Sequence, residues 1–336
     1  MAITMEDIAQ IAGVNRSTVS RALANSPRVK PDTRVRIQQM AREMGYLTNT
    51  VARSLTTKRT YNLGVLLLDI TEAYVGELVR EMDDAARRMG YGLILAHCGY
   101  GFQQIQSSVH MLIERRADAI IVSDRVIADI YSPLLDETSF PVVFLNIREK
   151  DHSLVTDNAG AARKGLTYLL DLGHRRIAYI GSPRAKVESN ERQRGYEQAL
   201  RERNTTPDPR LIVTPSSWAA AEAGREGIEV LLRESPLPTA VFCFNDLTAI
   251  GAIAAISVAG LRIPADISVL GFDNNSLAPY TVPALSTIAQ PKRLMAERAV
   301  QKALRLLTGQ PATEEGPLQC ELIVRDSTAP PRANPP

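Results

Sequence analysis

The chain has 336 residues, among them 39 lysines and arginines and 37 aspartates and glutamates, for a net charge of +2. This length exceeds one ordinary domain and is enough to bury a large core. The sequence contains no apolar run near the ~18 residues of a membrane span, and polar residues interrupt its N-terminus where a signal peptide would be apolar.

The charges are distributed unevenly along the chain. Residues 1–60 contain ten lysines and arginines and four acidic residues, whereas the rest of the chain is mildly acidic. This asymmetry predicts that only the N-terminal segment contacts a polyanion. The cysteines Cys98, Cys243 and Cys320 are odd in number and lie in apolar runs, so we expect buried free thiols in a cytoplasmic protein that does not contact a membrane.

The stretch from 4 to 13 predicts a short amphipathic helix. Thr4, followed three residues later by Asp7, has the spacing of a capping box, and Gly13 suits the left-handed turn that ends a helix. An apolar face with helical spacing lies between them, formed by Ile8, Ala9, Ile11 and Ala12. We interpret this helix as the first half of a helix-turn-helix.

A second helix is expected up to residue 23, with Val19 and Leu23 facing inward. Its outward positions are polar and include two cations: Arg16, Ser17, Ser20 and Arg21. Such a helix suits the major groove of DNA, where an arginine can give a guanine two parallel hydrogen bonds. The alternative is an ordinary helical hairpin with a solvated face, because short patterns of this kind produce many false positives.

A third helix is predicted from Pro31, a residue tolerated in a first helical turn, to Gly45. Residues 46–60 form a basic linker in which a short helix could run from Asn49 to Leu55. A helix this short is marginal in water. The segment is therefore either a flexible tether or a helix that forms on DNA, where Leu55 could insert between base steps of the minor groove.

From Leu63 on, apolar runs of strand length alternate with helical stretches such as Tyr74–Met89. The predicted strands lie at 64–68, 92–96, 119–122 and 142–145 and, after the pattern restarts, at 177–180, 211–213, 240–244 and 267–270. Continuous apolar strands that alternate with helices predict parallel sheets covered on both faces. Two similar α/β halves indicate two lobes with a cleft between them.

Ligands of open α/β sheets bind beyond the carboxyl ends of the strands. The residues expected at those ends are Asp69, Ser123, Asn146, Gly181, Asn245 and Asp273. Enzyme motifs are incomplete: Gln104 replaces the third glycine of a dinucleotide fingerprint, Leu166 replaces the lysine of a phosphate loop, and no G-x-S-x-G is present. Because the four histidines also lack metal-ligand spacing, we expect no catalytic residue, metal or cofactor.

Several segments, in this order, resemble the LacI family of bacterial transcriptional regulators. The head is similar to the family's helix-turn-helix over T-M-E-D-I-A-Q-I-A-G-V-N-R-S-T-V-S-R-A-L (4–23) and to its hinge helix over N-T-V-A-R-S-L (49–55). The similar segments of the core are L-G-H-R-R-I-A-Y-I-G (172–181), P-T-A-V-F-C-F-N-D (238–246), D-I-S-V-L-G-F-D (266–273) and L-S-T-I-A-Q-P (285–291).

The resemblance implies a homodimer that places one head in each half of a palindromic operator in double-stranded DNA. It implies base readout by Arg16, Ser17 and Arg21, and phosphate contacts by Ser20, Thr33 and Tyr46. In the hinge, Ala52 and Leu55 match the residues that enter the minor groove. Thr48 departs from the family, which usually has proline there, so the start of the hinge is less constrained.

The resemblance also implies an effector site in the cleft, formed by Tyr74, Asp157, Lys186, Arg192, Trp218, Asn245 and Asp273. An indole on the apolar face of a sugar, with Arg, Asn and Asp side chains on its hydroxyls, suits polyol binding. Purine-responsive members tend to carry two adjacent aromatics where this chain has Tyr74 and Val75, which favours a sugar or sugar derivative. The alternative roles are helix capping for Asn245 and Asp273, a surface ion pair for Arg192 and plain packing for Trp218.

The expected organisation is a helix-turn-helix domain (1–47), a hinge helix and linker (48–60), a two-lobed periplasmic-binding-protein-like core with two parallel α/β sheets (61–328) and a disordered tail (329–336). The N-lobe would comprise 61–158 and 291–317, and the C-lobe 159–290 and 318–328. We expect a dimeric repressor of sugar or carbohydrate metabolism genes, controlled by a small molecule in the cleft. The alternatives are a purine or a protein as co-effector, and a solute-binding protein with no role on DNA.

Overall fold

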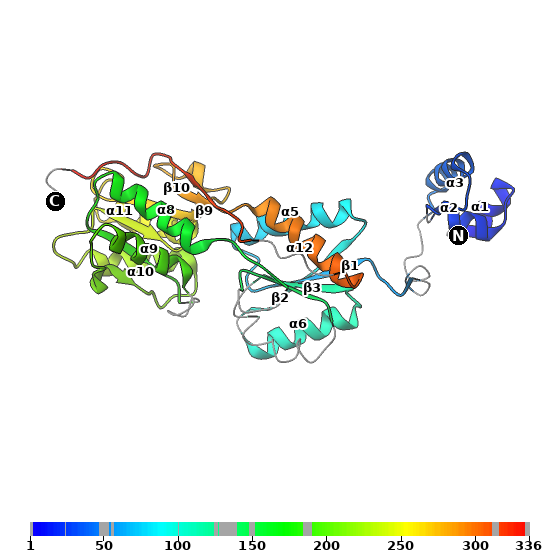
Figure 1. The fold of residues 1–336 in the computed structure, drawn as a ribbon, viewed down its shortest axis with the longest axis horizontal. Helices are drawn as coiled ribbons and strands as arrows, with labels where there is room; N and C mark the ends of the chain where they lie inside the picture. Colours follow the sequence, from blue (N-terminus) through cyan, green and yellow to red (C-terminus); the bar gives the residue numbers. More distant parts are fainter. Residues whose placement is uncertain are drawn as a thin grey trace. The chain divides into compact units, whose positions relative to one another are not determined.

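The chain folds into two compact units, a head (residues 1–60) and a core (residues 61–336). The computed structural model describes residues 3–23, 25–46, 54, 57–99, 101–123, 127, 140–147, 152–183, 190–310 and 316–332. The predictions for Thr48, Ala52, Leu55 and Lys186 lie outside the described residues. Figure 1 draws the course of the chain through both units.

The head contains three helices, α1 (Met5–Ala12), α2 (Arg16–Leu23) and α3 (Pro31–Glu43). The predicted capping box is confirmed: Thr4 Oγ1 accepts from the backbone N–H of Asp7, and the Asp7 carboxylate accepts from the backbone N–H of Thr4. Gly13 ends α1 with a φ of 66°. The three helices enclose a small core of Ile8, Ala9, Ala12, Val19, Ala22, Val29, Ile37 and Ala41.

Two apolar positions of the head differ from the prediction. Ile11 was expected on the buried face of α1 but is 62% exposed. In α2, Ala22 is fully buried, whereas Leu23 is only partly buried. Three short helices enclose only a small core, so the inward face of each is narrower than its run of apolar residues.

The N-lobe of the core is a parallel five-stranded sheet with the order β2-β1-β3-β4-β5. Its strands are β1 (Asn62–Leu67), β2 (Gly92–His97), β3 (Ala119–Val122), β4 (Val142–Leu145) and β5 (Ser153–Leu154). Alternate residues of β1 face opposite ways: Val65 packs with α5 (Ala73–Arg88) and α12 (Lys292–Leu307), and Leu66 with α6 (Phe102–Glu114). Helices therefore cover both faces of the sheet (Figure 1).

The C-lobe is a six-stranded sheet with the order β11-β10-β9-β8-β6-β7, parallel except for β11. Its strands are β6 (Ile177–Ile180), β7 (Ile212–Val213), β8 (Ala240–Cys243), β9 (Ser268–Asp273), β10 (Ser286–Ala289) and β11 (Glu321–Ile323). Its helices are α8 (Asn158–Asp171), α9 (Glu191–Glu202), α10 (Ala220–Leu231) and α11 (Asp246–Val258), with the 3-10 turns η2 (Pro209–Leu211) and η3 (Ala278–Tyr280). The prediction of two parallel α/β sheets is confirmed.

Glycines let the paired helices of the C-lobe approach closely. A Cβ on Gly224 of α10 would lie 1.9 Å from the carbonyl oxygen of Thr248 in α11, and one on Gly251 would lie 1.8 Å from that of Ala221. Gly195 of α9 makes the same kind of approach to α8. These contacts fix the helix N-termini that follow β6 and β8, and those termini carry residues of the site described below.

The C-terminal segment corrects a prediction, because residues 329–332 are not disordered. The Ala329 carbonyl oxygen lies 2.9 Å from Nε2 of buried His174 and accepts from the Ser268 hydroxyl, and Arg332 pairs with Asp266. Residues 329–332, which include Pro330 and Pro331, therefore form a fixed strap on the C-lobe, since the backbone N–H and carbonyl groups of Ala329 both find partners there. Residues 333–336 lie outside the described part of the chain.

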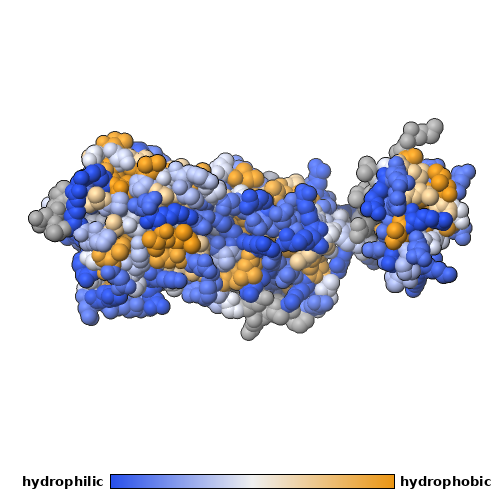
Figure 2. All heavy atoms as spheres, turned by 90° about the horizontal axis from the view of Figure 1, so that it is seen from above, coloured by the Kyte–Doolittle hydropathy of each residue, from blue (hydrophilic) through white to orange (hydrophobic). Residues whose placement is uncertain are grey.

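Hydrophilic residues cover most of the core face seen in Figure 2, interrupted by apolar patches. Large apolar side chains of the C-lobe that are almost fully exposed include Val258, Tyr280 and Val282. The three cysteines are buried and free, as predicted. Among the described helices, none combines the length and apolar character that crossing a lipid bilayer requires.

Candidate functional site

A cleft of about 350 Å³ is lined by residues at the carboxyl ends of strands from both sheets of the core. Ser123 follows β3 and Asn146 follows β4 in the N-lobe. Asn245 follows β8 in the C-lobe, and Asp273 ends β9. Four of the six strand-end residues singled out in the sequence therefore line one cavity, whereas Asp69 and Gly181 do not.

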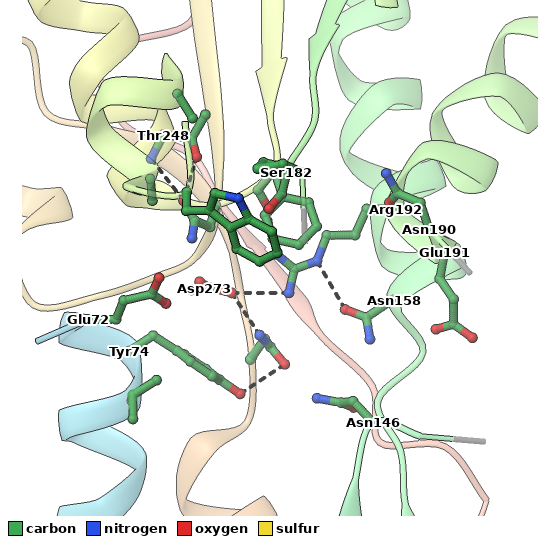
Figure 3. Close-up of a pocket in the computed structure, with 18 of the residues that line it drawn as sticks. Glu72, Tyr74, Asn146, Asn158, Ser182, Asn190, Glu191, Arg192, Thr248 and Asp273 are labelled. Atoms are coloured by element: carbon green, nitrogen blue, oxygen red, sulfur yellow. Dashed lines mark hydrogen bonds and ion pairs between the residues drawn. The ribbon is translucent and has the colours of Figure 1, made fainter. Parts of the chain in front are cut away.

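Arg192, at the start of α9, is the central cation of the cleft (Figure 3). Its guanidinium donates to Asn158 Oδ1 at 3.2 Å, to the carbonyl oxygen of Phe244 and to Asp273 Oδ1 at 3.3 Å. It also lies over the Phe272 ring, 3.7 Å from the ring centroid. These contacts fix the plane of the guanidinium and leave two of its five N–H donors without a protein acceptor among the described residues.

Asp273 is only 5% exposed and is the anionic partner of Arg192. Its Oδ1 also accepts from Gln290 Nε2 at 2.7 Å, whereas no described residue donates to Oδ2. Burial raises the pKa of Asp273 above its ordinary range, although the charge of Arg192 opposes the rise. A buried carboxylate oxygen that lacks a donor in the protein is a ready acceptor for a ligand hydroxyl.

Three asparagines of the cleft also take part in local folding. Asn245 Oδ1 caps α11 by accepting from the Thr248 N–H at 2.8 Å, and Asn190 Oδ1 caps α9. Asn146 Oδ1 accepts from both the backbone N–H and the hydroxyl of Thr156. In each case the oxygen is used by the protein, so the amide nitrogen is the group that can face a ligand, although Asn190 Nδ2 also donates to Gln193 Oε1 at 3.4 Å.

Aromatic side chains form the apolar part of the cleft. Trp218 precedes α10 and is 45% exposed although it lines the cavity. Tyr74, from α5 of the N-lobe, donates to Gln290 Oε1 at 3.3 Å, and Gln290 in turn donates to Asp273 (Figure 3). Burial and the nearby Asp273 carboxylate raise the pKa of the Tyr74 phenol, which stays protonated and able to donate.

The polar face of α2 is the second candidate site. Val19 and Ala22 are buried against the other helices of the head, while Arg16, Ser17, Ser20 and Arg21 are all exposed. Thr33, near the start of α3, and Tyr46, after its end, are half-buried. The helix therefore presents two guanidinium groups and two hydroxyls on one surface, groups of the kind that can bond to base edges in a major groove.

Comparison with known proteins identifies the family of this chain. The family model described as "Bacterial regulatory proteins, lacI family" matches residues 4–49. A second family model, described as "Periplasmic binding protein-like domain", matches residues 166–328. The HTH-type transcriptional repressor CytR of Escherichia coli (strain K12) is 33% identical over 97% of this chain and 96% of its own length. The chain belongs to the LacI family of bacterial transcriptional regulators.

Solved LacI-family structures share the fold of the whole chain. The lac repressor dimer bound to operator and the anti-inducer ONPF matches with a TM-score of 0.81 and 27% identity, covering 98% of this chain and all of the other. The CelR–cellobiose complex matches with a TM-score of 0.71 and 26% identity, covering 97% and 99%. This LacI-family protein is accordingly a DNA-binding transcriptional regulator and not an enzyme, and the alternative of a solute-binding protein without a role on DNA is excluded.

Of the residues that the family resemblance placed in the cleft, five line one cavity: Tyr74, Arg192, Trp218, Asn245 and Asp273. Asp157 is not among the lining residues; it caps α8 by accepting from the Gly160 N–H at 3.0 Å. Lys186 lies outside the described residues. Among the described residues, no group of three or more His, Cys, Asp or Glu side chains is placed to hold a metal ion.

Several lining residues of this LacI-family cleft were not identified from the sequence: Glu72, Asn158, Ser182, Asn190, Glu191, Phe244 and Gln290. Phe244 lies next to Asn245 at the end of β8, so its position at a strand end could have identified it. Gln290 follows β10, whose sequence S-T-I-A has no continuous apolar run and was not predicted as a strand. The remaining residues lie at helix N-termini or in loops, where apolar periodicity carries no information.

Proposed function

We propose that this regulator is a repressor of genes for carbohydrate use, and that a neutral sugar or sugar derivative in the cleft controls its affinity for DNA. It would act in the cytoplasm as a homodimer, with one head in each half of a palindromic operator. A change in the angle between the lobes would separate the paired hinge segments and release the DNA. The observation that carries the effector proposal is the Asp273 carboxylate oxygen that no described residue satisfies.

The chemistry of the cleft supports a polyol. Asp273 Oδ2 and the two remaining N–H groups of Arg192 offer an acceptor beside donors, the pattern that one or two sugar hydroxyls satisfy. Trp218 adds a flat apolar surface for the C–H face of a pyranose ring. A cavity of about 350 Å³ falls in the range of small-molecule sites.

The homodimer and the operator are supported by relatives and by the surface of the C-lobe. The lac repressor that matches this fold is a dimer bound to operator. The exposed side chains of Val258, Tyr280 and Val282 provide apolar area that contact with another subunit would cover. Arg16, Ser17 and Arg21 would read bases, Ser20, Thr33 and Tyr46 would contact phosphates, and Ala52 and Leu55 would enter the minor groove.

Thermal unfolding against a panel of sugars, sugar phosphates, polyols and purines tests the effector. A ligand at one hundred times its Kd stabilises the core by ~2.7 kcal/mol, which raises Tm by several degrees at ~2–4 °C per kcal/mol. One sugar that gives this shift with the wild type but not with Asp273→Ala would support the proposal. A shift from a purine alone, or a flat panel with a protein captured instead, would reject it.

Gel shift with genomic fragments tests the DNA role separately. We expect a few fragments with inverted repeats to be retained at moderate salt, and the effective sugar to release them. Retention that depends only on fragment length would mean that binding is not sequence-specific. Tighter binding in the presence of the sugar would make the sugar a co-repressor instead of an inducer.

A further inference from the structure

Two charged side chains of the N-lobe hold the segment of the C-lobe that carries Asp273. Glu77 lies on α5 and Lys292 begins α12, and the two side chains form an ion pair with 2.6 Å between Nζ and Oε2. Both helices pack into the N-lobe core through residues such as Met82 and Met295. The pair is largely buried, so water screens it less than it would a surface pair.

Both members of the pair also bind the backbone of the opposite lobe. Lys292 Nζ donates to the carbonyl oxygens of Asp273 at 3.2 Å and of Asn274 at 2.7 Å. Glu77 Oε1 accepts from the backbone N–H of Ser276 at 2.6 Å. One ion pair of the N-lobe is therefore joined by three hydrogen bonds to the main chain of residues 273–276.

The backbone held in this way has an unusual conformation. Asp273 has a φ of 109° and Asn274 a φ of 49°, in the left-handed region that side chains with a Cβ disfavour. Such residues keep this conformation only where their surroundings hold it. The two carbonyl oxygens bound by Lys292 belong to these same two residues, so the contacts from the N-lobe act directly at the strained positions.

We propose that Glu77 and Lys292 form an interlobe clamp that positions Asp273, so that the effector site is complete only at this relative orientation of the lobes. This inference rests on the proposed function of the cleft. The clamp makes lobe orientation and effector binding reciprocal: a movement of the N-lobe pulls on the Asp273 backbone, and a ligand held by Asp273 resists that movement. Glu77 and Lys292 are positioning residues, because neither has to contact the ligand.

Hydrogen exchange of the full-length protein without ligand tests the contact itself. In Glu77→Ala the Ser276 amide loses its acceptor, and we expect its exchange to become at least tenfold faster. Glu77→Gln keeps an acceptor oxygen but not the charge, so it should retain most of the protection. Lys292→Met should speed exchange across 273–276, whereas its neighbour Arg293→Met, an exposed side chain paired with Glu297, should not.

A charge reversal separates a clamp from a simple ion pair. Glu77→Lys combined with Lys292→Glu restores opposite charges but places a carboxylate against two carbonyl oxygens and an ammonium against an N–H. We therefore expect no rescue of amide protection. Full rescue would overturn the clamp, because it would show that an ion pair within the N-lobe protects these amides without the hydrogen bonds to residues 273–276. Unchanged Ser276 exchange in Glu77→Ala would overturn it as well.

The positioning role is tested with D-glucose, D-ribose, cellobiose and glucose 6-phosphate as probes. For whichever sugar stabilises the wild type, Lys292→Met should weaken binding at least tenfold, while Arg293→Met leaves binding unchanged. Faster exchange at 273–276 with undiminished sugar affinity would refute the positioning of Asp273. If none of these sugars binds the wild type, the proposed sugar effector fails, and the clamp is still judged by its exchange and charge-reversal results.

Discussion

The guanidinium of Arg192 donates to Asp273 at 3.3 Å while it lies over the ring of Phe272, the residue that precedes Asp273 in the chain. The end of one strand thus supplies both the charge and the aromatic face that hold this arginine. Lysine cannot reproduce the arrangement, because an ammonium lacks the planar fork that serves several acceptors at once. Burying the Arg192–Asp273 pair costs solvation free energy, since both charges are largely removed from water.

Arg192→Lys is therefore expected to weaken binding of the effective sugar at least tenfold in calorimetric titration, with the protein still folded. Arg192→Met should in addition lower the free energy of unfolding by about 3–5 kcal/mol, because it leaves the Asp273 charge buried without its partner. Arg201→Lys is the matched control, since Arg201 lies on the same helix, outside the cleft lining, with an exposed side chain paired to Glu197. Wild-type affinity in Arg192→Lys would exclude a direct role of the guanidinium.

Arg21→Ala tests the readout face of α2. If Arg21 forms a bidentate contact with one base, its loss should relax the preference at one base pair per half-site by ~1–3 kcal/mol, measured by competition between single-base operator variants. Arg28, an exposed arginine of the head outside the helices, provides the comparison. An equal loss on every variant would instead make Arg21 a phosphate contact.

Most of the fold could be predicted because its determinants are local or periodic. The capping box of α1 follows from Thr4 and Asp7 alone. The buried strands β3, β4, β6 and β8 are continuous apolar runs, and the structure places each where the sequence predicted it. The polar residues that follow these strands could be named for the same reason, since the carboxyl ends of parallel strands meet at one edge.

The elements that escaped prediction depend on partners far along the chain. β10 contains Ser286 and Thr287, fully buried because Thr328 and Asp246 satisfy their hydroxyls. The strap at 329–332 is fixed by His174, about half the chain away. Asp157 was placed in the cleft by resemblance, whereas its carboxylate caps a helix. A polar side chain can be buried when a residue far along the chain forms a hydrogen bond with it. The local sequence pattern does not show which residue that is.

Leu55→Ala tests the hinge prediction, which concerns a residue outside the described part of the chain. If Leu55 inserts between base steps, the alanine variant should bend operator DNA less and bind it more weakly, because the smaller side chain cannot hold the two base pairs apart. Energy transfer between dyes at the ends of an operator fragment measures the bend. Sugar affinity of the core serves as the control and should not change. A wild-type bend would assign Leu55 to the linker.

Asp246→Asn tests how a buried carboxyl next to the cleft responds to pH. Asp246 begins α11, is fully buried, and accepts from the Asn275 N–H at 2.7 Å and from the Thr287 hydroxyl. Burial, followed by the nearby Asp273 charge, raises its pKa from an ordinary 3.8 to about 7. Asparagine can accept from Asn275 and donate to the Thr287 hydroxyl, so the variant should fold.

The sign of the effect follows from proton binding. Between pH 3.8 and about 7 the folded protein keeps a proton on Asp246 that the unfolded chain has lost, so this group makes stability fall as pH rises. The full fall is on the order of 4 kcal/mol, at ~1.4 kcal/mol per pKa unit. Relative to the wild type, Asp246→Asn should therefore gain stability progressively from pH 4 to pH 7 in thermal unfolding, an interval set by these two pKa values.

Asp208→Asn is the control for this pH series. Hydrogen bonds from Arg210 lower the pKa of the Asp208 carboxyl from 3.8 to about 2, so the carboxyl is largely ionised in both the folded and the unfolded chain by pH 5. The difference between Asp208→Asn and the wild type should stay constant from pH 5 upward, whereas that of Asp246→Asn should change. A constant difference for Asp246→Asn as well would mean that the Asp246 carboxyl is ionised throughout. In that case the hydrogen bonds from Asn275 and Thr287 would outweigh the cost of burying its charge.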